Sequence, residues 1–225
     1  MNASVLVTGV SGGLGRAVSS QLLDRGYSVI GSARNPGAEK FPVLPLDLAN
    51  DQSIVDLAAA VTQPIDILIN NAGIATITPE SGREEAPFDN LTRDEFAQIM
   101  NVNVIGTFLL TRALLPHLKK GQRKLIVNLS SNLGSIVNND SGGRYAYRTS
   151  KAALNMITKC LAVDLAADGF TCLAWHPGWV KTKMGGADAD ITAEESARSL
   201  CDFLPKITAA HNGQFLNRRG ELLNW

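Results

Sequence analysis

The stretch TGVSGGLG, residues 8–15, follows a short apolar run and stands directly before an amphipathic segment. Gly9, Gly13 and Gly15 allow a tight turn, close approach of the backbone to a pyrophosphate, and close packing of a helix on a sheet. The N-terminus of that helix offers free N–H groups and a positive dipole end to phosphates. A glycine motif alone also fits a simple tight turn, but its position between strand and helix favours dinucleotide binding.

Short apolar runs alternate with longer helical patterns along the rest of the chain. The expected strands cover residues 4–8, 27–32, 42–46, 66–70, 124–130, 170–175 and 213–216. The expected helices cover residues 14–25, 52–61, 92–119, 145–167 and 193–203. Most strand runs are continuously apolar, as in strands covered on both faces. The alternation predicts one α/β domain over residues 1–225, with a doubly wound, mostly parallel, seven-stranded sheet and helices on both faces.

The composition describes an ordinary globular chain with no global electrostatic field. Lys+Arg and Asp+Glu number 21 each, which argues against nucleic acid or an anionic membrane as partner. No apolar run reaches the roughly 18 residues that span a bilayer, and the N-terminus does not resemble a signal peptide. Scattered cysteines and histidines predict reduced thiols, a cytoplasmic location and no metal site. We expect all three cysteines, Cys160, Cys172 and Cys201, to be buried or half-buried.

The end of the second expected strand bears on the choice between NAD and NADP. A carboxylate there would accept the ribose 2′-hydroxyl of NAD, but the chain has Ala33 and Arg34. An arginine can hold a 2′-phosphate through charge-assisted hydrogen bonds. The sequence therefore predicts NADP, with NAD less favoured, unless Arg34 is only a solvated loop residue.

The stretch YAYRTSK, residues 145–151, places a tyrosine four positions before a lysine. On a helix, Tyr147 and Lys151 share one face, whereas Tyr145 points away. The pair alone also fits two surface side chains. Two polar loops, 76–90 and 132–143, follow the carboxyl ends of expected strands, where open α/β sheets bind ligands.

Taken together, the motifs resemble the short-chain dehydrogenase/reductase family over essentially the whole chain. The matching stretches are TGVSGGLG (8–15), NNAG (70–73), VNVIG (102–106), NLSS (128–131), YRTSK (147–151) and HPGWVKT (176–182). GGRYAYRTSKAALN, HPGWVKTKMGG and GQFLNRRGELLNW are most similar to the carbonyl-reductase branch that includes the sniffer and C-factor proteins.

The resemblance implies a role for each matching residue. Tyr147 would be the general acid/base and Lys151 its partner, and both would also contact the cofactor. Ser131 would position the substrate carbonyl, and Asn103 would help to hold a water leading to Lys151. The other cofactor-binding residues would be Gly9, Ser11, Gly13 and Leu14 at the phosphates, Arg34 at the 2′-phosphate, Asp47 and Leu48 at the adenine, Asn71, Ala72 and Gly73 at the ribose, and Val180 and Thr182 at the carboxamide and phosphate.

Two departures from the family pattern leave alternatives open. Ser131 lies sixteen residues before Tyr147 rather than the more usual thirteen, so Ser130 and Ser135 stay candidates for its role. Many NADP-preferring relatives carry a basic residue where this chain has Gly12. Arg34 would then have to carry most of the cofactor preference.

The predicted function is hydride transfer between NADPH and an aldehyde, ketone or quinone, or the corresponding alcohol. An acid must protonate the alkoxide. A lysine ammonium one turn away, together with the oxidised nicotinamide, would favour the phenolate and lower the tyrosine pKa from about 10. The alternative is an NADP-binding signalling or sensor protein of the C-factor type with incidental catalysis. Besides the small-molecule substrate, we expect a second copy of the chain as partner, in a homodimer or homotetramer built on helices 92–119 and 145–167.

Overall fold

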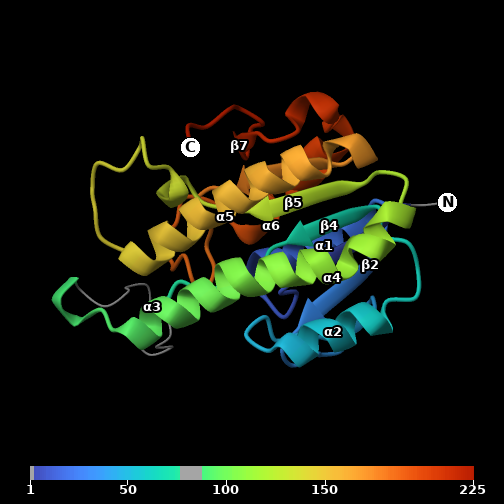
Figure 1. Ribbon diagram of the computed structural model, residues 1–225, viewed down its shortest axis with the longest axis horizontal. Coiled ribbons are helices and arrows are strands. Elements are labelled where there is room, and N and C mark those ends of the chain that lie inside the picture. The colour runs from blue at the N-terminus through green and yellow to red at the C-terminus, as the bar shows by residue number, and fades with distance from the viewer. Residues whose placement is uncertain (1–2, 77–87) are drawn as a thin grey trace.

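A parallel sheet forms the middle of the molecule, and helices cover both of its faces (Figure 1). The computed structural model describes residues 3–76 and 88–225. Its strands are β1 (Ser4–Thr8), β2 (Ser28–Ala33), β3 (Val43–Pro45), β4 (Ile67–Asn70), β5 (Leu125–Leu129), β6 (Thr171–His176) and β7 (Phe215–Asn217). Its α-helices are α1 (Gly13–Asp24), α2 (Asp51–Ala60), α3 (Arg93–Met100), α4 (Thr107–Lys120), α5 (Tyr145–Asp164) and α6 (Ala193–Phe203). The strand order is β3-β2-β1-β4-β5-β6-β7 with every neighbouring pair parallel, which confirms the predicted doubly wound α/β fold.

Apolar side chains fill the space on both faces of the sheet. Val5 and Val7 of β1 belong to the core formed with α1 and α6. Leu6, between them, belongs to the core formed with α2 and α4 on the other face. Burial of apolar surface, worth about 25 cal/mol per Å², is the main favourable contribution to such a fold. Because both faces are covered, the central strands appear in the sequence as continuous apolar runs.

The expected helix over residues 92–119 differs from the prediction in its middle. α3 and α4 form one continuous rod, but a π-helical segment, Asn101–Gly106, lies between them. A Cβ at Gly106 would overlap the carbonyl oxygen of Leu48, so the rod is pressed against the connection between β3 and α2. Hydrophobic spacing alone does not distinguish a π-helical segment from an α-helix. Such segments are frequent at functional sites, and this one carries Asn103.

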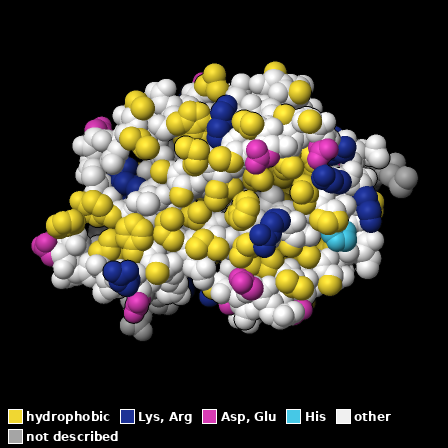
Figure 2. All heavy atoms as spheres, in the orientation of Figure 1, with side chains coloured by type: hydrophobic (Ala, Val, Ile, Leu, Met, Phe, Trp, Pro, Cys, Tyr) yellow, Lys and Arg dark blue, Asp and Glu magenta, His cyan; other side chains and the backbone are white. Residues whose placement is uncertain are grey.

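The rod Arg93–Lys120 is long and apolar enough to cross a membrane by length and composition. Leu110 and Leu114 on its inner side are fully buried, and the core helix of a globular protein passes the same test. Figure 2 shows hydrophobic side chains gathered over the outer sides of α4 and α5. We call four of these exposed residues the α4–α5 patch: Ile105, Phe108, Met156 and Val163.

A line of buried amides and hydroxyls crosses the sheet near its carboxyl edge. The side-chain amide of Asn70 donates to Thr111 Oγ1 on α4 (3.0 Å) and to Asn128 Oδ1 on β5 (2.8 Å). The Asn128 amide donates in turn to Thr158 Oγ1 on α5 (2.8 Å). Because buried polar groups need hydrogen-bond partners, this line fixes how the two long helices lie on β4 and β5.

The carboxylate of Asp66 accepts hydrogen bonds from two other segments at the opposite edge of the sheet, where β1 and β4 begin. Its Oδ2 accepts hydrogen bonds from the Ser4 N–H (2.7 Å) and hydroxyl (3.2 Å). Its Oδ1 accepts from the N–H groups of Gln122 (2.6 Å) and Arg123 (3.4 Å). Partial burial alone would raise the pKa of Asp66, but these hydrogen bonds outweigh it and lower the pKa below its ordinary value. The start of β1, the start of β4 and the turn before β5 are thus joined through one charged group.

We predict that Asp66→Asn lowers the free energy of unfolding at pH 7 by about 1–3 kcal/mol, because hydrogen bonds to a carboxylate are replaced by weaker ones to an amide. The folded-state pKa lies below the unfolded one, so the stabilisation is present above about pH 4 and is lost as the pH falls through the folded-state pKa. Urea denaturation across this range measures the difference. Asp168→Asn is the control, because the exposed pair of Asp168 with Lys119 should contribute little. Equal effects of the two substitutions would contradict the assignment.

Candidate active site

The loop after β1 has the backbone geometry of a phosphate cradle. Gly9 and Gly13 have φ angles of 75° and 53°, in the left-handed region that favours glycine. A Cβ at Gly15 would overlap the Gly9 carbonyl and the side-chain amide of Asn71. α1 begins at Gly13 with no side-chain cap, which leaves its first N–H groups for a ligand. Ser11 is exposed on this loop, and Leu14 packs against the core beneath it.

The segment after β4 is hydrogen-bonded to this loop. Thr8 Oγ1 accepts from the N–H groups of Asn71 (3.0 Å) and Ala72 (2.9 Å). The Asn71 side chain donates to the Thr8 carbonyl (2.7 Å). A Cβ at Gly73 would approach Asn103 Oδ1 to 3.0 Å, so glycine leaves room there for Asn103. The structure therefore brings the predicted ribose-binding residues next to the predicted phosphate loop.

A hollow of about 750 Å³ lies between α1 and the segment after β6. Gly12, Gly13, Lys181 and Thr182 are among the residues that line it. A Cβ at Gly13 would come within 3.2 Å of Thr182 Cγ2, so the two sides of the hollow nearly touch at this point. Val180 is buried beside it. The hollow joins the glycine loop to the predicted carboxamide-binding segment.

The predicted adenosine residues lie at the ends of β2 and β3. The N–H groups of Gly9 and Val10 donate to the Ser32 carbonyl (2.8 and 3.0 Å), which holds the end of β2 beside the glycine loop. Ala33 ends β2, and Arg34 follows it with its side chain exposed. The two remaining residues of this set, Asp47 (exposed) and Leu48 (buried), follow the neighbouring strand β3.

Tyr147 and Lys151 lie one turn apart on α5, as their spacing predicts. Lys151 is buried, and its ammonium donates to the Leu129 carbonyl at the end of β5 (2.8 Å). The same nitrogen lies 5.7 Å from the centre of the Tyr147 ring. Ser131, just after β5, hydrogen-bonds the Tyr147 phenol. The end of β5 and the first turns of α5 thus bring three of the predicted catalytic residues together.

Asn103 is held within the same cluster by the π-helical segment. Its side chain accepts from the Ile74 N–H (2.8 Å) and donates to the Ile74 carbonyl (2.7 Å). It also donates to Ser150 Oγ (3.0 Å), and the Ser150 hydroxyl donates to the Tyr147 carbonyl (2.7 Å). Asn103 therefore ties the chain after β4 to the first turn of α5, a connection that the sequence does not indicate.

Burial governs the protonation of the two central groups. It lowers the pKa of Lys151 to about 8. It also raises the pKa of Tyr147, although the Ser131 hydroxyl and the positive charge of Arg144 act in the opposite direction. Desolvation of the phenolate therefore acts against the lowering of the tyrosine pKa that the sequence predicts from Lys151 and the oxidised nicotinamide.

The three candidate serines have different partners. The Ser130 hydroxyl is buried and donates to Asn155 Oδ1 (2.6 Å). The Ser135 hydroxyl is buried and donates to the carbonyl of Trp225 (3.2 Å). Ser131 Oγ accepts from the Leu133 N–H (3.2 Å) and hydrogen-bonds Tyr147. Of the three, Ser131 is the serine whose hydroxyl hydrogen-bonds Tyr147.

Arg144, which the sequence does not single out, lies close enough to Tyr147 for its positive charge to lower the pKa of that phenol. Gly142, Gly143 and Arg144 have φ angles of 62°, 64° and 49°, so three successive left-handed residues lead into α5. An arginine in this conformation is unusual and is sustained by its surroundings. The Arg148 guanidinium holds the turn by donating to the Gly142 carbonyl (3.1 Å). The only sequence signal for this turn is the glycine pair before Arg144.

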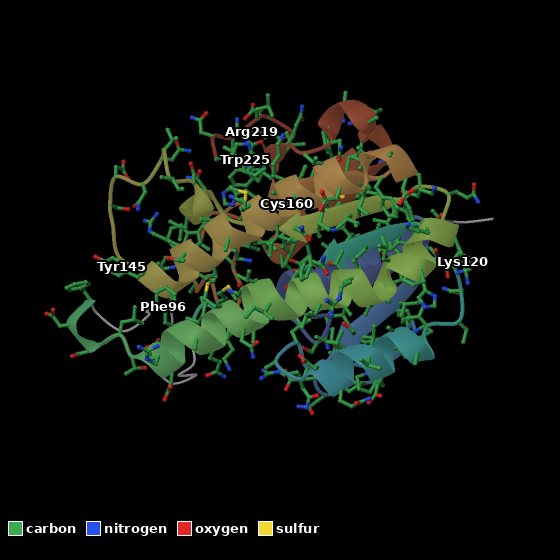
Figure 3. All side chains as sticks on the ribbon, viewed as in Figure 1. Phe96, Lys120, Tyr145, Cys160, Arg219 and Trp225 are labelled. Atoms are coloured by element: carbon green, nitrogen blue, oxygen red, sulfur yellow. The ribbon has the colours of Figure 1, made fainter. Side chains whose placement is uncertain are left out.

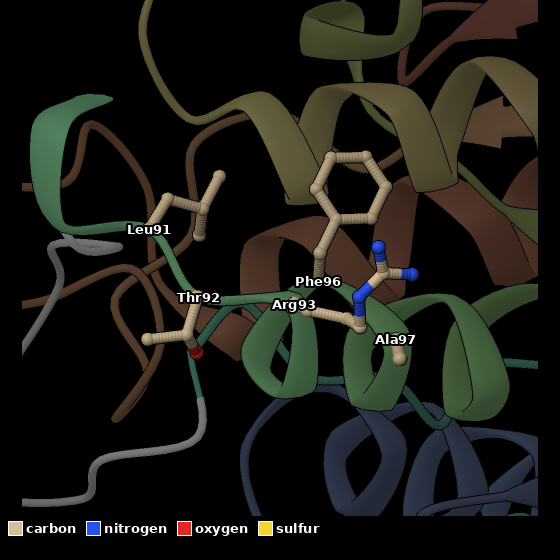
Figure 4. A pocket seen from close by; sticks show the side chains of 5 residues that line it. All are labelled: Leu91, Thr92, Arg93, Phe96 and Ala97. Carbon is tan, nitrogen blue, oxygen red and sulfur yellow. The ribbon is translucent and has the colours of Figure 1, made fainter.

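A second hollow, of about 350 Å³, lies at the start of α3 and contains none of the predicted site residues. Leu91, Thr92, Arg93, Phe96 and Ala97 line it (Figure 4). Tyr145 lies at the same end of the molecule as Phe96 (Figure 3). The Tyr145 ring contacts the ring of Phe88, with ring centres 5.4 Å apart, and so points away from the Tyr147–Lys151 pair. Residues 77–87 of the predicted 76–90 loop lie outside the described residues.

The cysteines do not all follow the expectation. Cys172 and Cys201 are buried, as predicted, but Cys160 is exposed. Cys160 lies on α5, where apolar residues extend onto the outward side of the helix, so an apolar run did not imply burial.

Within residues 3–76 and 88–225, no three His, Cys, Asp or Glu side chains gather as a metal site.

Comparison with known proteins yields similar sequences and folds. The sequence model of the family described as short chain dehydrogenase matches residues 3–192. C-signal from Myxococcus xanthus is 36% identical over 164 residues, which are 73% of this chain and 95% of that protein. The carbonyl reductase Sniffer of D. melanogaster is 33% identical with a TM-score of 0.91, over 100% of both chains. The NADPH-bound carbonyl reductase from chicken fatty liver is 32% identical with a TM-score of 0.89, again over 100% of both chains.

Proposed function

The chain belongs to the short-chain dehydrogenase family, and from this we propose that it is an NADPH-dependent carbonyl reductase. Its substrate is the carbonyl of an aldehyde, ketone or quinone, or the corresponding alcohol in the reverse direction. The observation that carries the proposal is the meeting of Ser131, Tyr147 and Lys151 at the end of β5, on the same sheet edge as the glycine loop. Steady-state oxidation of NADPH with a panel of such carbonyl compounds tests it.

The residues around the glycine loop fit a dinucleotide. Gly9, Gly13 and Gly15 leave a cradle that side chains would fill, and the uncapped start of α1 suits phosphate. Asn71, Ala72 and Gly73 would hold the ribose, and Val180 and Thr182 the carboxamide and phosphate. The nicotinamide, when bound, supplies or accepts the hydride.

The proton is the contribution of the chain itself. Tyr147 donates its phenolic proton to the carbonyl oxygen as negative charge develops there. Ser131 donates a hydrogen bond to the same oxygen, where a preorganised donor stabilises the transition state most. Lys151, held by the Leu129 carbonyl, favours the phenolate that Tyr147 becomes. Asn103 orients the first turn of α5 through Ser150 and supports a water leading to Lys151.

Arg34 carries the preference for NADPH. It follows Ala33 at the end of β2, where an NAD-binding carboxylate would otherwise stand. Its exposed guanidinium is available to a 2′-phosphate beside the glycine loop. The bound NADPH of the chicken carbonyl reductase supports the same cofactor here. Asp47 and Leu48 would contact the adenine.

A signalling role is the second candidate, favoured by the similarity to C-signal. In that case the chain would bind NADP, and its turnover would be incidental. The carbonyl panel separates the two functions, because incidental catalysis would give only slow steady-state turnover with every substrate of the panel. We propose a cytoplasmic location for either function, since the three cysteines are free thiols.

A second copy of this chain is the proposed partner, bound through the α4–α5 patch. Its four apolar side chains are between 37% and 67% exposed and come from the π-helical segment, α4 and α5 (Figure 2). Two such faces in a symmetric pair would cover one another. We propose a homodimer, or a homotetramer that contains this dimer.

We predict that Tyr147→Phe keeps the fold and the NADPH affinity but lowers turnover by about 100-fold or more, because it removes only the transferable proton. Tyr145→Phe is the matched control, since that ring contacts Phe88. Turnover and NADPH binding are measured for both variants. Equal activity of the two would refute the assigned proton donor.

Arg34→Ala should weaken NADPH binding by about 10- to 150-fold, the equivalent of losing a 1.5–3 kcal/mol hydrogen bond to a charged group. NADH affinity should stay nearly unchanged, because NADH has no 2′-phosphate for Arg34 to hold. Isothermal titration of both cofactors against both proteins provides the measurement. If the wild type binds NADH and NADPH equally, Arg34 is only a solvated loop residue.

Met156→Glu should dissociate the dimer at micromolar concentration, because it places a charge in the middle of an apolar contact. Val55→Glu, at an exposed apolar position on α2, is the control and should leave the mass unchanged. Light scattering coupled to size exclusion gives the mass of each. A monomeric wild type would remove the basis for this interface.

A further inference from the structure

The residues after β7 turn back along that strand. Asn217 closes the turn: its Oδ1 accepts from the Arg219 N–H (2.8 Å) and its amide donates to Glu221 Oε2 (2.7 Å). Leu222 then pairs antiparallel with Leu216, and the Leu223 N–H donates to the Phe215 carbonyl (2.8 Å). The stretch GQFLNRRGELLNW, which resembles the carbonyl-reductase branch, contains this turn, yet none of its residues has a role in the proposed reaction.

Trp225 is anchored by its ring. The indole stacks on the ring of Phe215, with centres 5.5 Å apart and planes 22° apart. Phe215 is itself fully buried in the sheet, so the stack rests on a fixed support. Figure 3 shows Trp225 on the same side of α5 as Arg219, at the edge where β7 lies. Aromatic pairs of this kind contribute about 0.5–1.5 kcal/mol beyond the area they bury.

The main-chain oxygen of Trp225 binds the loop that follows β5 through hydrogen bonds. It accepts hydrogen bonds from the N–H groups of Ile136 (3.1 Å) and Val137 (3.3 Å) and from the Ser135 hydroxyl (3.2 Å). Ser135 Oγ in turn accepts from the Asn138 N–H (3.2 Å). A single oxygen thus fixes the far end of a short turn whose near end is β5.

Ser131 is the first residue of that turn. Its carbonyl accepts from the Gly134 N–H (2.8 Å), and its Oγ accepts from the Leu133 N–H (3.2 Å). The Ser135 N–H donates to the Asn132 carbonyl (3.0 Å). α5 holds the middle of the turn, because the Asn155 side-chain amide donates to the Gly134 carbonyl (3.4 Å). β5 holds the end next to Ser131, and Trp225 holds the other end. The orientation of the Ser131 hydroxyl therefore depends in part on the contacts of Trp225.

We propose that Trp225 is a positioning residue of the active site. Its ring, stacked on Phe215, sets its main-chain oxygen against Ser135, Ile136 and Val137, and this contact keeps the Ser131 hydroxyl directed at Tyr147. The proposal rests on the proposed function of Ser131. Cofactor affinity should be unaffected, because Trp225 contacts Phe215 and the turn after β5 rather than the glycine loop.

The experiment is a double-mutant cycle with Trp225→Ala and Ser131→Ala. In the wild-type background, Trp225→Ala should lower kcat/KM for a carbonyl substrate by about tenfold or more, as expected for a displaced catalytic group, with the NADPH Kd unchanged. In the Ser131→Ala background, the same substitution should lower kcat/KM by less than about twofold, the range of ordinary non-additivity. A merely structural role would lower activity by the same factor in both backgrounds, and that result would overturn the proposal.

Two further variants sharpen the result. Trp225→Phe keeps an aromatic ring on Phe215 and should restore most of the activity that Trp225→Ala loses. Leu222→Ala is the matched control, because its exposed side chain lies on the same returning segment and touches none of the donors in the turn. If Trp225→Ala does not fold, Ser135→Ala removes one of the three hydrogen bonds and should show the same coupling to Ser131→Ala with a smaller loss. Absence of that coupling would also reject the proposal.

A second readout does not depend on activity. Amide hydrogen exchange over residues 131–138 should become faster in Trp225→Ala than in wild type, while exchange in residues 8–15 stays the same. Unchanged exchange over residues 131–138 would overturn the proposal even where activity falls. A wild type that reduces no carbonyl compound would reject the proposed function. Faster exchange over residues 131–138 in Trp225→Ala would still show that Trp225 holds the turn.

Discussion

One buried ammonium dictates the arrangement of the active site. Lys151 cannot leave its charge unpaired in the interior, and the Leu129 carbonyl at the end of β5 is its partner. The surroundings are shaped to admit it: a Cβ at Gly73 would lie 3.7 Å from the ammonium, and one at Gly134 would approach the Lys151 Cβ to 2.8 Å. α5 is therefore held at a fixed height above the sheet edge, and Tyr147 one turn earlier has its place determined by the same contact.

The cofactor half and the catalytic half of the site share the strands that hold them. Thr8 at the end of β1 binds the chain that leaves β4, and Asn103 binds that chain a few residues later. Through Ser150, Asn103 reaches the first turn of α5. A hydrogen-bonded path thus runs from the glycine loop to the proposed proton donor. In the proposed reaction, hydride and proton must reach adjacent atoms of one carbonyl group. The relative position of the cofactor and Tyr147 therefore depends on this hydrogen-bonded path.

Local sequence patterns predicted the strands well because burial on both faces requires continuous apolar runs; β1 and α6 begin and end at the expected residues. The same patterns missed features that depend on distant contacts. The π-helical segment follows from the close approach of Gly106 to Leu48, and the raised pKa of Tyr147 follows from burial. Residue spacing located the Tyr147–Lys151 pair, but it contained no information on Arg144 or on the residues that hold Ser131. Family resemblance favoured Ser131, and only the partners of Ser130 and Ser135 distinguish the three.

The contact between Trp225 and Ser135 joins residues 90 positions apart, which has a consequence for the order of assembly during synthesis. β1 to β5 pair among themselves and can associate while the rest of the chain is still on the ribosome. The turn after β5 reaches its final contacts only once residue 225 has been synthesised. In a nascent chain, the central strands would thus be paired before the turn that contains Ser131 is held at both ends.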